Sequence, residues 1–310
     1  MKAARFDYMR PRSVAETVAA LEHNDDAVLL GGGQSLMPLL VGRRLRPSWV
    51  VDLNGLESSL GRVAIEQSDG GSGVIRIGAL VRHSQLEHHE VVKEVLPVLS
   101  DAASCVGYPA VRNRGTVGGS VAFCHPAAEL PAALAAVGAT VMVRGSRGQR
   151  EMPVASIARA PFSNTLAQDE VVVEVSVPLD MSGEKAGVPA GEHRTGSAWF
   201  EFSRGRSEFP LAGIAAVIWL DGNGRCVGAR AVAGGVGPAP VDLTECLGDL
   251  VGNSWLGDRL AEALAKHVER RIDPPSDLSG SARDRSEVAG LLLRRALRAA
   301  WDRARAGASS

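Results

Sequence analysis

Apolar positions in the first part of the chain predict a mixture of short helices and strands. Between residues 13 and 22 the apolar side chains recur at helical spacing, and Ser13 is placed to cap that helix. Helical stretches are also expected at 36–41, 91–105 and 129–137. Short apolar runs bounded by turn residues predict strands at 27–30, 49–53, 74–80, 140–144 and 171–177.

A polar, glycine-rich segment, residues 180–196, is the predicted linker between a domain at 1–179 and a domain at 197–310. Beyond it, strands are expected at 199–203, 211–220 and 226–234, and helices at 256–271 and 286–304. The sequence DGNG at 221–224 predicts a hairpin turn, because glycine and asparagine tolerate positive φ. Strands and helices do not alternate strictly, which predicts an α+β fold.

Composition narrows the class of protein without deciding its function. The 310 residues are 45% hydrophobic and 22% charged, and the net charge of -1 gives no global attraction for nucleic acid. The N-terminus lacks the apolar region of a signal peptide, and no apolar run approaches the roughly 18 residues that span a bilayer. The four cysteines form no CxxC motif. A cytoplasmic protein without a metal site is expected.

The first candidate for chemistry is a glycine-rich segment between a predicted strand and a predicted helix. It consists of Gly31, Gly32, Gly33, Gln34 and Ser35, followed by Leu36. Glycines allow backbone amides to approach a pyrophosphate closely, and the Ser35 hydroxyl adds a donor. A tight turn without a ligand explains the same pattern. Leu36 excludes the GxGxxG dinucleotide fingerprint, and the absence of a following Gly-Lys-Ser/Thr excludes a Walker A loop.

A second glycine-rich segment strengthens the phosphate hypothesis. It contains Thr116, Val117, Gly118, Gly119 and Ser120. Two such segments can clamp one diphosphate from opposite sides, and a valine at Gly118 is then expected to block the ligand. Glu129 can accept hydrogen bonds from a ribose hydroxyl, although an acidic residue at a helix start is also favoured by the helix dipole.

Both segments, in this order, resemble those of the FAD-binding medium subunit of the molybdenum hydroxylases, the xanthine dehydrogenase and carbon monoxide dehydrogenase family. The resemblance spans nearly the whole chain through FDYMRP, LLGGGQSLMPLL, VVDLNGL, IGALVRHSQLE, PAVRNRGTVGGSVAFCHPAAELPAAL, SEFPLAGIAAV, AVAGGVGPAPV and GLLLRRAL. It implies a two-part FAD-binding domain of the vanillyl-alcohol oxidase (PCMH) type. It also implies a smaller C-terminal α+β domain whose antiparallel sheet covers the isoalloxazine side.

The resemblance implies roles for individual residues. Both glycine segments would bind the FAD diphosphate, Glu129 would lie near the adenosine part, and Val172 would contact the adenine end. Glu201, Arg206 and Phe209 belong to the segment that approaches the flavin ring in relatives.

The chain also departs from the family pattern. At 123–126 it reads FCHP where relatives often have HADP, so a role for that aspartate is not supported. Cys124 is expected to be a small buried residue, and His125 is a candidate neighbour of the cofactor. Carbon monoxide dehydrogenases tend to have lysine at Glu201 and tyrosine at Phe209, which favours relatives that hydroxylate heterocycles or aldehydes.

The function implied by the resemblance is electron transfer without a catalytic side chain on this chain. A large subunit would oxidise the substrate at a molybdenum cofactor, and a small subunit with two [2Fe-2S] clusters would pass electrons to FAD here and on to an external acceptor. The lack of cluster-type cysteine spacing agrees with this division. A dimer of heterotrimers is expected. The alternatives are a stand-alone FAD oxidase of the vanillyl-alcohol oxidase type, a carbon monoxide dehydrogenase medium subunit, and an assembly protein without cofactor, against which the intact glycines argue.

Overall fold

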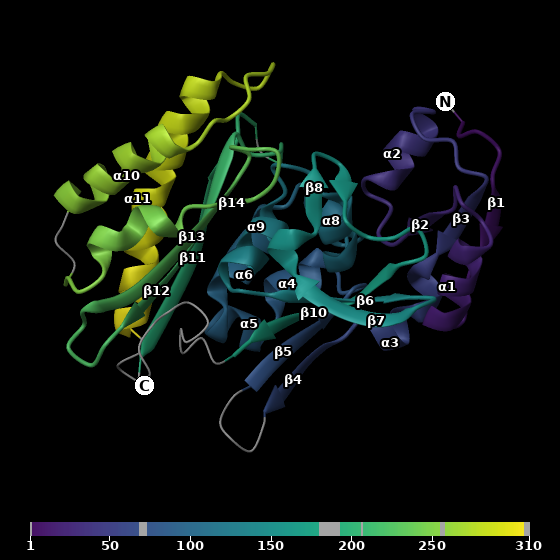
Figure 1. The fold of residues 1–310 in the computed structure, drawn as a ribbon, viewed down its shortest axis with the longest axis horizontal. Coiled ribbons are helices and arrows are strands. Elements are labelled where there is room, and N and C mark those ends of the chain that lie inside the picture. The colour runs from purple at the N-terminus through teal and green to yellow at the C-terminus, as the bar shows by residue number, and fades with distance from the viewer. Residues whose placement is uncertain (1, 68–72, 180–192, 206, 255–257, 307–310) are drawn as a thin grey trace.

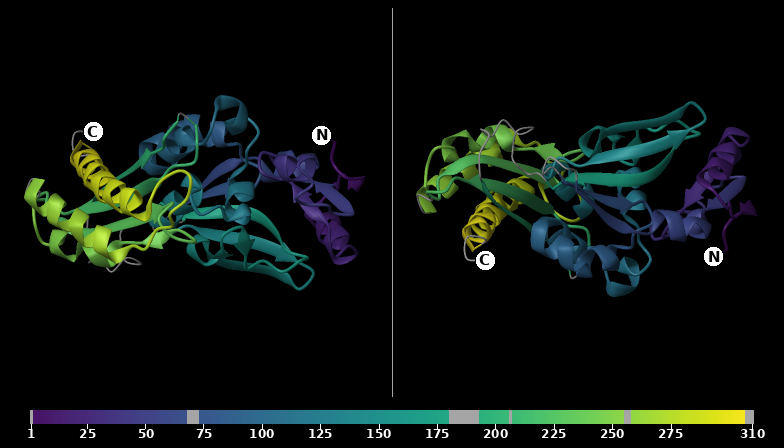
Figure 2. Two further views of the ribbon diagram at one scale, coloured as in Figure 1. Left: turned by 90° about the horizontal axis from the view of Figure 1, so that it is seen from above. Right: turned by 90° about the horizontal axis from the view of Figure 1, so that it is seen from below.

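The computed structural model describes all residues except 1, 68–72, 180–192, 206, 255–257 and 307–310. Figure 1 shows three units in sequence along the longest axis, with the N-terminal unit at one end and the two C-terminal helices at the other. The views from above and below in Figure 2 show the same order. The middle unit therefore lies between the other two.

The N-terminal unit is a three-stranded parallel sheet with the strand order β1-β3-β2. Its elements are β1 (Asp7–Met9), α1 (Val14–Glu22), β2 (Val28–Leu30), α2 (Leu36–Val41) and β3 (Trp49–Asp52). The Ser13 side chain caps α1 by accepting a hydrogen bond from the Glu16 amide, as predicted. The first glycine segment connects β2 to α2, which confirms its predicted place between a strand and a helix.

The middle unit is a five-stranded antiparallel sheet with helices on one face. The strand order is β4 (Val63–Gln67), β5 (Gly73–Gly78), β10 (Val171–Pro178), β6 (Thr140–Gly145) and β7 (Gly148–Pro153). The helices are α3 (Glu57–Leu60), α4 (His83–His88), α5 (Glu90–Val95), α6 (Pro97–Cys105), α7 (Pro109–Arg112), α8 (Val117–Phe123) and α9 (Glu129–Ala136). Short 3-10 helices η1 (Leu53–Leu56) and η2 (Val154–Ser156) and the hairpin β8 (Ala158–Ala160) with β9 (Ser163–Asn164) complete the unit. Its sheet packs on α6, α8 and α9 in the largest core.

The C-terminal unit is a four-stranded antiparallel sheet. Its elements are β11 (Arg194–Phe202), β12 (Ala212–Leu220), β13 (Cys226–Gly234), β14 (Val241–Asp242), η4 (Thr244–Leu250), α10 (Asp258–Arg271) and α11 (Ala282–Ala306). The hairpin between β12 and β13 turns at 221–224, where Gly224 has a φ of 76°, as the sequence predicted.

The C-terminal sheet joins the rest of the molecule through strand β12. All nine residues of this strand are buried, so both of its faces are covered. Ala215, Val217 and Trp219 belong to the core shared with α6 and α9. The alternate residues, such as Ile214 and Ile218, pack in a second core under α11. Side chains alternate between the two faces of a strand, so a continuous apolar run indicates a sheet covered on both faces. This sheet is the seam between the two predicted domains.

The α+β class is confirmed, and two details of the prediction are corrected. The helical stretch expected at 91–105 consists of α5 and α6, which are separated at Leu96. Pro97 lacks an amide hydrogen and disfavours helical geometry at Leu96, whose φ and ψ are -133° and 55°. Strand β11 begins at Arg194, inside the predicted linker at 180–196, of which 180–192 lie outside the described residues. The division into domains at 1–179 and 197–310 stays a prediction.

Close packing of α11 on β11 gives the first testable prediction. A Cβ at Gly196 would overlap the carbonyl oxygen of Ala300 and the amide nitrogen of Ala304. We expect Gly196→Ala to push α11 off the sheet and lower the free energy of unfolding by about 1–3 kcal/mol, as overpacking does. Denaturant titration measures this change. Gly222→Ala, where a Cβ meets nothing within 4 Å, is the control and should leave the midpoint unchanged.

Candidate functional site

The first glycine segment presents backbone amides that the protein itself does not use. Among the hydrogen bonds of the described residues, none is donated by the amides of Gly32, Gly33, Gln34 and Ser35. Gly33 has a φ of 75°, a conformation that favours glycine. The Ser35 hydroxyl makes no capping bond at the start of α2, so it stays available to a ligand. This run of open donors can bind an anion.

The carbonyl groups of the same segment are held in place. Asn54 Nδ2 donates to the Gly31 carbonyl at 2.9 Å, and Gln34 Nε2 donates to the Gly32 carbonyl at 3.3 Å. The Met37 amide donates to the Gly33 carbonyl at 3.0 Å. Carbonyls are thus bonded to the protein while the neighbouring amides are open.

The second glycine segment is the first turn of α8 and not a free loop. The amides of Val117 and Gly118 donate to the carbonyls of Val81 and Ala79 at 3.0 and 2.9 Å. The Gly119 amide donates to Thr116 Oγ1 at 3.2 Å, and the Ser120 amide to the Thr116 carbonyl at 2.9 Å. The amides of Val117 to Ser120 are therefore already bonded within the protein. The segment can still offer a ligand the hydroxyl groups of Ser120 and of Thr116, which is 3% exposed.

The structure also changes the reason for a glycine at position 118. Gly118 is buried, and a Cβ there would lie 2.6 Å from Ala79 Cβ and 2.9 Å from the Ala79 carbonyl oxygen. A side chain here would therefore clash with the protein itself, whether or not a ligand is bound. Gly118 permits α8 to pack against the turn after β5, so Gly118→Val acts first on folding.

The two glycine segments touch each other. A Cβ on Gly32 would overlap the carbonyl oxygen of Arg114 and lie 2.7 Å from Gly115 Cα. A Cβ on Gly31 would lie 3.0 Å from Thr116 Oγ1. The segments therefore lie side by side in contact, and the clamping of one diphosphate by both of them stays a prediction.

Four rings meet where the middle unit faces the loop between β11 and β12. His125 and Phe209 stack with their centroids 3.6 Å apart and an angle of 10° between the planes. Phe162 meets His125 edge-on at 5.2 Å and Phe123 at 5.4 Å. Phe162 and Phe209 are 60% and 53% exposed. Burial lowers the pKa of His125 to about 4, so this ring is neutral at pH 7.

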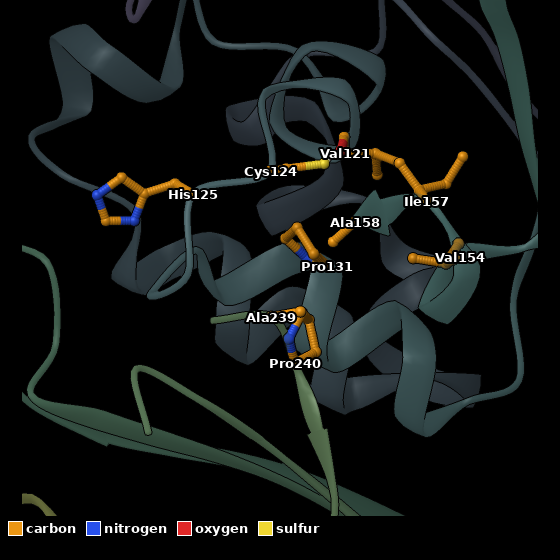
Figure 3. A pocket seen from close by; sticks show the side chains of 9 residues that line it. All are labelled: Val121, Cys124, His125, Pro131, Val154, Ile157, Ala158, Ala239 and Pro240. Carbon is orange, nitrogen blue, oxygen red and sulfur yellow. Dashed lines mark hydrogen bonds between the residues drawn. The ribbon is translucent and has the colours of Figure 1, made fainter. Parts of the chain in front are cut away.

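Beside this aromatic cluster lies an apolar hollow between α8, α9 and η2 (Figure 3). Its lining consists of Val121, Cys124, His125, Pro131, Val154, Ile157, Ala158, Ala239 and Pro240. In Figure 3 the His125 ring lies at the margin and points away from the other side chains. Burial raises the pKa of the Cys124 thiol to about 11, which fits a small buried residue and not a nucleophile.

Two carboxyl groups from different units, Glu129 of α9 and Glu201 of β11, interact electrostatically. Glu129, in the first turn of α9, is 3% exposed, and Glu201 on β11 accepts a hydrogen bond from Trp199 Nε1 at 3.0 Å. Burial, and then the charge of Glu201, raise the pKa of Glu129 to about 8. Burial raises the pKa of Glu201 to about 7. Cys105 of α6 adjoins the pair, and burial followed by the Glu201 charge raises its thiol pKa to about 12. The pair therefore retains a proton near neutral pH.

Three residues with implied roles at the cofactor lie at or near this seam. The roles that the resemblance implies for Glu129, near the adenosine part, and for Glu201, near the flavin, stay predictions. Val172 is 5% exposed and belongs to the main core, and its contact with the adenine end stays a prediction. Arg206 lies outside the described residues.

Comparison with known proteins decides the family. A family model described as "FAD binding domain in molybdopterin dehydrogenase" matches residues 4–180, and "CO dehydrogenase flavoprotein C-terminal domain" matches residues 197–300. The chain belongs to this family. It is an FAD-binding medium subunit of the molybdopterin hydroxylases, of the carbon monoxide dehydrogenase and xanthine dehydrogenase type, and hence part of a multi-subunit oxidoreductase.

Individual relatives of the medium subunit match over nearly their full length. The alpha subunit of the 6-hydroxypseudooxynicotine dehydrogenase complex of Paenarthrobacter nicotinovorans is 36% identical, over 98% of this chain and 97% of the relative. The beta subunit of caffeine dehydrogenase from Pseudomonas sp. (strain CBB1) is 32% identical with the same coverage. A chain of carbon monoxide dehydrogenase from Hydrogenophaga pseudoflava superposes with a TM-score of 0.86 at 31% identity, covering 98% of this chain and 99% of that one.

Sequence reasoning missed the residues that join the two glycine segments of this medium subunit, namely Asn54 and Arg82. Arg82 Nη2 donates to Asn54 Oδ1 at 2.7 Å, and Arg82 Nη1 donates to the Arg114 carbonyl at 2.8 Å. Both lie in stretches that carry the family resemblance, VVDLNGL and IGALVRHSQLE, but no spacing rule links them. Within the described ranges there is no helix long and apolar enough to cross a membrane, and no group of metal-binding side chains.

The buried carboxyl on α9 gives a prediction for the pH dependence of stability. The pKa of Glu129 is raised from 4.5 to about 8, so its burial costs nothing below about pH 4.5 and destabilises the fold as pH rises towards 8. We expect Glu129→Gln to flatten the decline in unfolding free energy between about pH 5 and pH 8, measured by denaturation of flavin-free protein. The exposed Glu22→Gln should retain the wild-type slope, and an unchanged slope in Glu129→Gln contradicts the assignment.

Proposed function

We propose that this medium subunit binds the diphosphate of FAD on the first glycine segment and transfers electrons between a partner subunit and an external acceptor. The observation that carries the proposal is the row of open amides from Gly32 to Ser35, packed directly against Arg114 and Gly115. Such a row fits the two negative charges of a diphosphate. A side chain at Gly32 would fill the space that this packing needs.

Several residues of this chain would hold the cofactor. The amides of Gly32, Gly33 and Gln34 would donate to phosphate oxygens, and the hydroxyls of Ser35 and Thr116 would add donors. The exposed Phe209 and the neutral His125 are the neighbours we assign to the flavin ring, since both lie in the seam that the C-terminal sheet closes. As the resemblance implies, Glu201 would lie near the flavin ring and Glu129 near the adenosine part, and the pKa values of both carboxyl groups are raised.

FAD, when bound, supplies the redox chemistry, and this chain binds and orients it. The substrate would be oxidised on a large subunit at a molybdenum cofactor, and a small subunit with [2Fe-2S] clusters would deliver the electrons. Relatives named for 6-hydroxypseudooxynicotine, caffeine and glyceraldehyde support a heterocycle or an aldehyde as the substrate of the whole enzyme. A dimer of heterotrimers in the cytoplasm stays the predicted assembly.

The visible absorption spectrum tests this proposal. The chain, purified with its co-expressed partner subunits, should show the two bands of oxidised flavin and release FAD on denaturation. The separated chain should not turn over candidate substrates, because the oxidation occurs on another subunit. Turnover by the chain alone would favour a stand-alone oxidase, and a colourless preparation without releasable FAD would refute the proposal.

The contact between the glycine segments gives a sharper prediction. Gly32→Ala places a Cβ against the Arg114 carbonyl, which pushes the segments apart and displaces the open amides. We expect FAD affinity to fall by about tenfold or more, equivalent to about 1.4 kcal/mol. Fluorescence titration of flavin-depleted protein measures it. Gly248→Ala, where a Cβ meets nothing within 4 Å, is the matched control and should bind FAD as the wild type does.

A further inference from the structure

The junction of the two glycine segments is held by a polar side chain that follows β3. Asn54 lies in η1, and its Nδ2 donates to the Gly31 carbonyl at 2.9 Å. Its own backbone amide donates to Asp52 Oδ1 at 2.9 Å, and Asp52 Oδ2 accepts a hydrogen bond from the Tyr8 hydroxyl at 2.5 Å. Asn54 is therefore fixed at both its backbone and its side chain.

A guanidinium group extends this contact to the second segment. Arg82 is 9% exposed, and its two terminal nitrogens donate to different partners: Nη2 to Asn54 Oδ1 at 2.7 Å and Nη1 to the Arg114 carbonyl at 2.8 Å. The carboxylate of Glu57 lies 3.7 Å from Nη2. An unbroken series of hydrogen bonds thus runs from the Gly31 carbonyl through Asn54 and Arg82 to the Arg114 carbonyl.

Peptide geometry gives this bridge a consequence for the amides. The Gly31 carbonyl and the Gly32 N–H belong to one peptide unit, which is planar and trans, so the two groups point in opposite directions. When Asn54 holds the Gly31 carbonyl, it also directs the Gly32 N–H away from itself. The Gly32 amide is the first open donor of the segment.

We propose that Asn54 and Arg82 are positioning residues for the diphosphate, a role that rests on the proposed function. Asn54 directs the Gly32 amide, and Arg82 fixes the distance between the first segment and Arg114. Neither side chain needs to touch the cofactor. Arginine suits this position because its planar group presents two donors in a fixed fork, whereas lysine presents a single ammonium group.

Two substitutions separate geometry from charge. Asn54→Leu keeps the size and the neutral charge of the side chain but removes the amide that donates to the Gly31 carbonyl and to Asp52 Oδ1. Arg82→Lys retains the positive charge but loses the two-ended bridge. We expect each to weaken FAD binding on the order of tenfold, because the Gly32 amide or the position of Arg114 is no longer fixed. Binding of riboflavin, which lacks the diphosphate, should be unchanged. Arg76→Lys is the control. Arg76 of β5 also bridges two partners, Glu66 of β4 and Glu174 of β10, but it contacts neither glycine segment.

The measurement is fluorescence titration of the flavin-depleted full chain, or of its complex with partner subunits, with FAD and with riboflavin. The melting temperature of each flavin-free variant is recorded beside it. A variant that melts lower and loses FAD and riboflavin binding alike has only a structural role, which overturns the inference. Wild-type FAD affinity in both variants also overturns it while the proposed function stands. If the wild-type protein itself binds no FAD, the proposed function and this inference both fail.

Discussion

The C-terminal sheet must be covered on both faces, and most of the architecture follows from that requirement. All nine residues of β12 are buried, because α11 packs on one face of the sheet and α6 with α9 on the other. The inner cover belongs to the middle unit. The two halves of the chain are therefore joined by a continuous core, and Arg303 of α11 reinforces the join by binding Asp101 of α6 at 2.6 Å.

The same seam creates the chemical environment at the flavin end of the proposed site. Alternation along β11 turns Gly196, Ala198 and Phe200 towards α11, so Trp199 and Glu201 face the helices of the middle unit. Glu201 is thereby half-buried on the same side of the sheet as the middle unit, and desolvation raises its pKa to about 7. Burial and the charge of Glu201 raise the pKa of Glu129 to about 8.

The two glycine segments look alike in sequence but differ in structure. In the first segment the backbone amides are not bonded to the protein, whereas the carbonyl groups are. Free N–H donors are what an anion requires. In the second, the amides bond to the turn after β5, and the glycines permit close packing. The second segment supports the first, and Asn54 with Arg82 joins them. A glycine can thus be required because a ligand must approach the backbone or because another part of the protein packs against it. The sequence does not distinguish these two reasons.

Sequence by itself determined the local elements and the family. The Ser13 cap, the place of the first glycine segment, the hairpin at 221–224 and the α+β class all depend on neighbouring residues or on motif order. Tertiary structure alone decided that α8 begins within the second segment, that Val172 is in the core, and that the charge of Glu201 acts on Glu129. It also decided that Asn54, Arg82 and Arg114 form one bridge. These contacts join residues far apart in the chain, and local spacing carries no information about them.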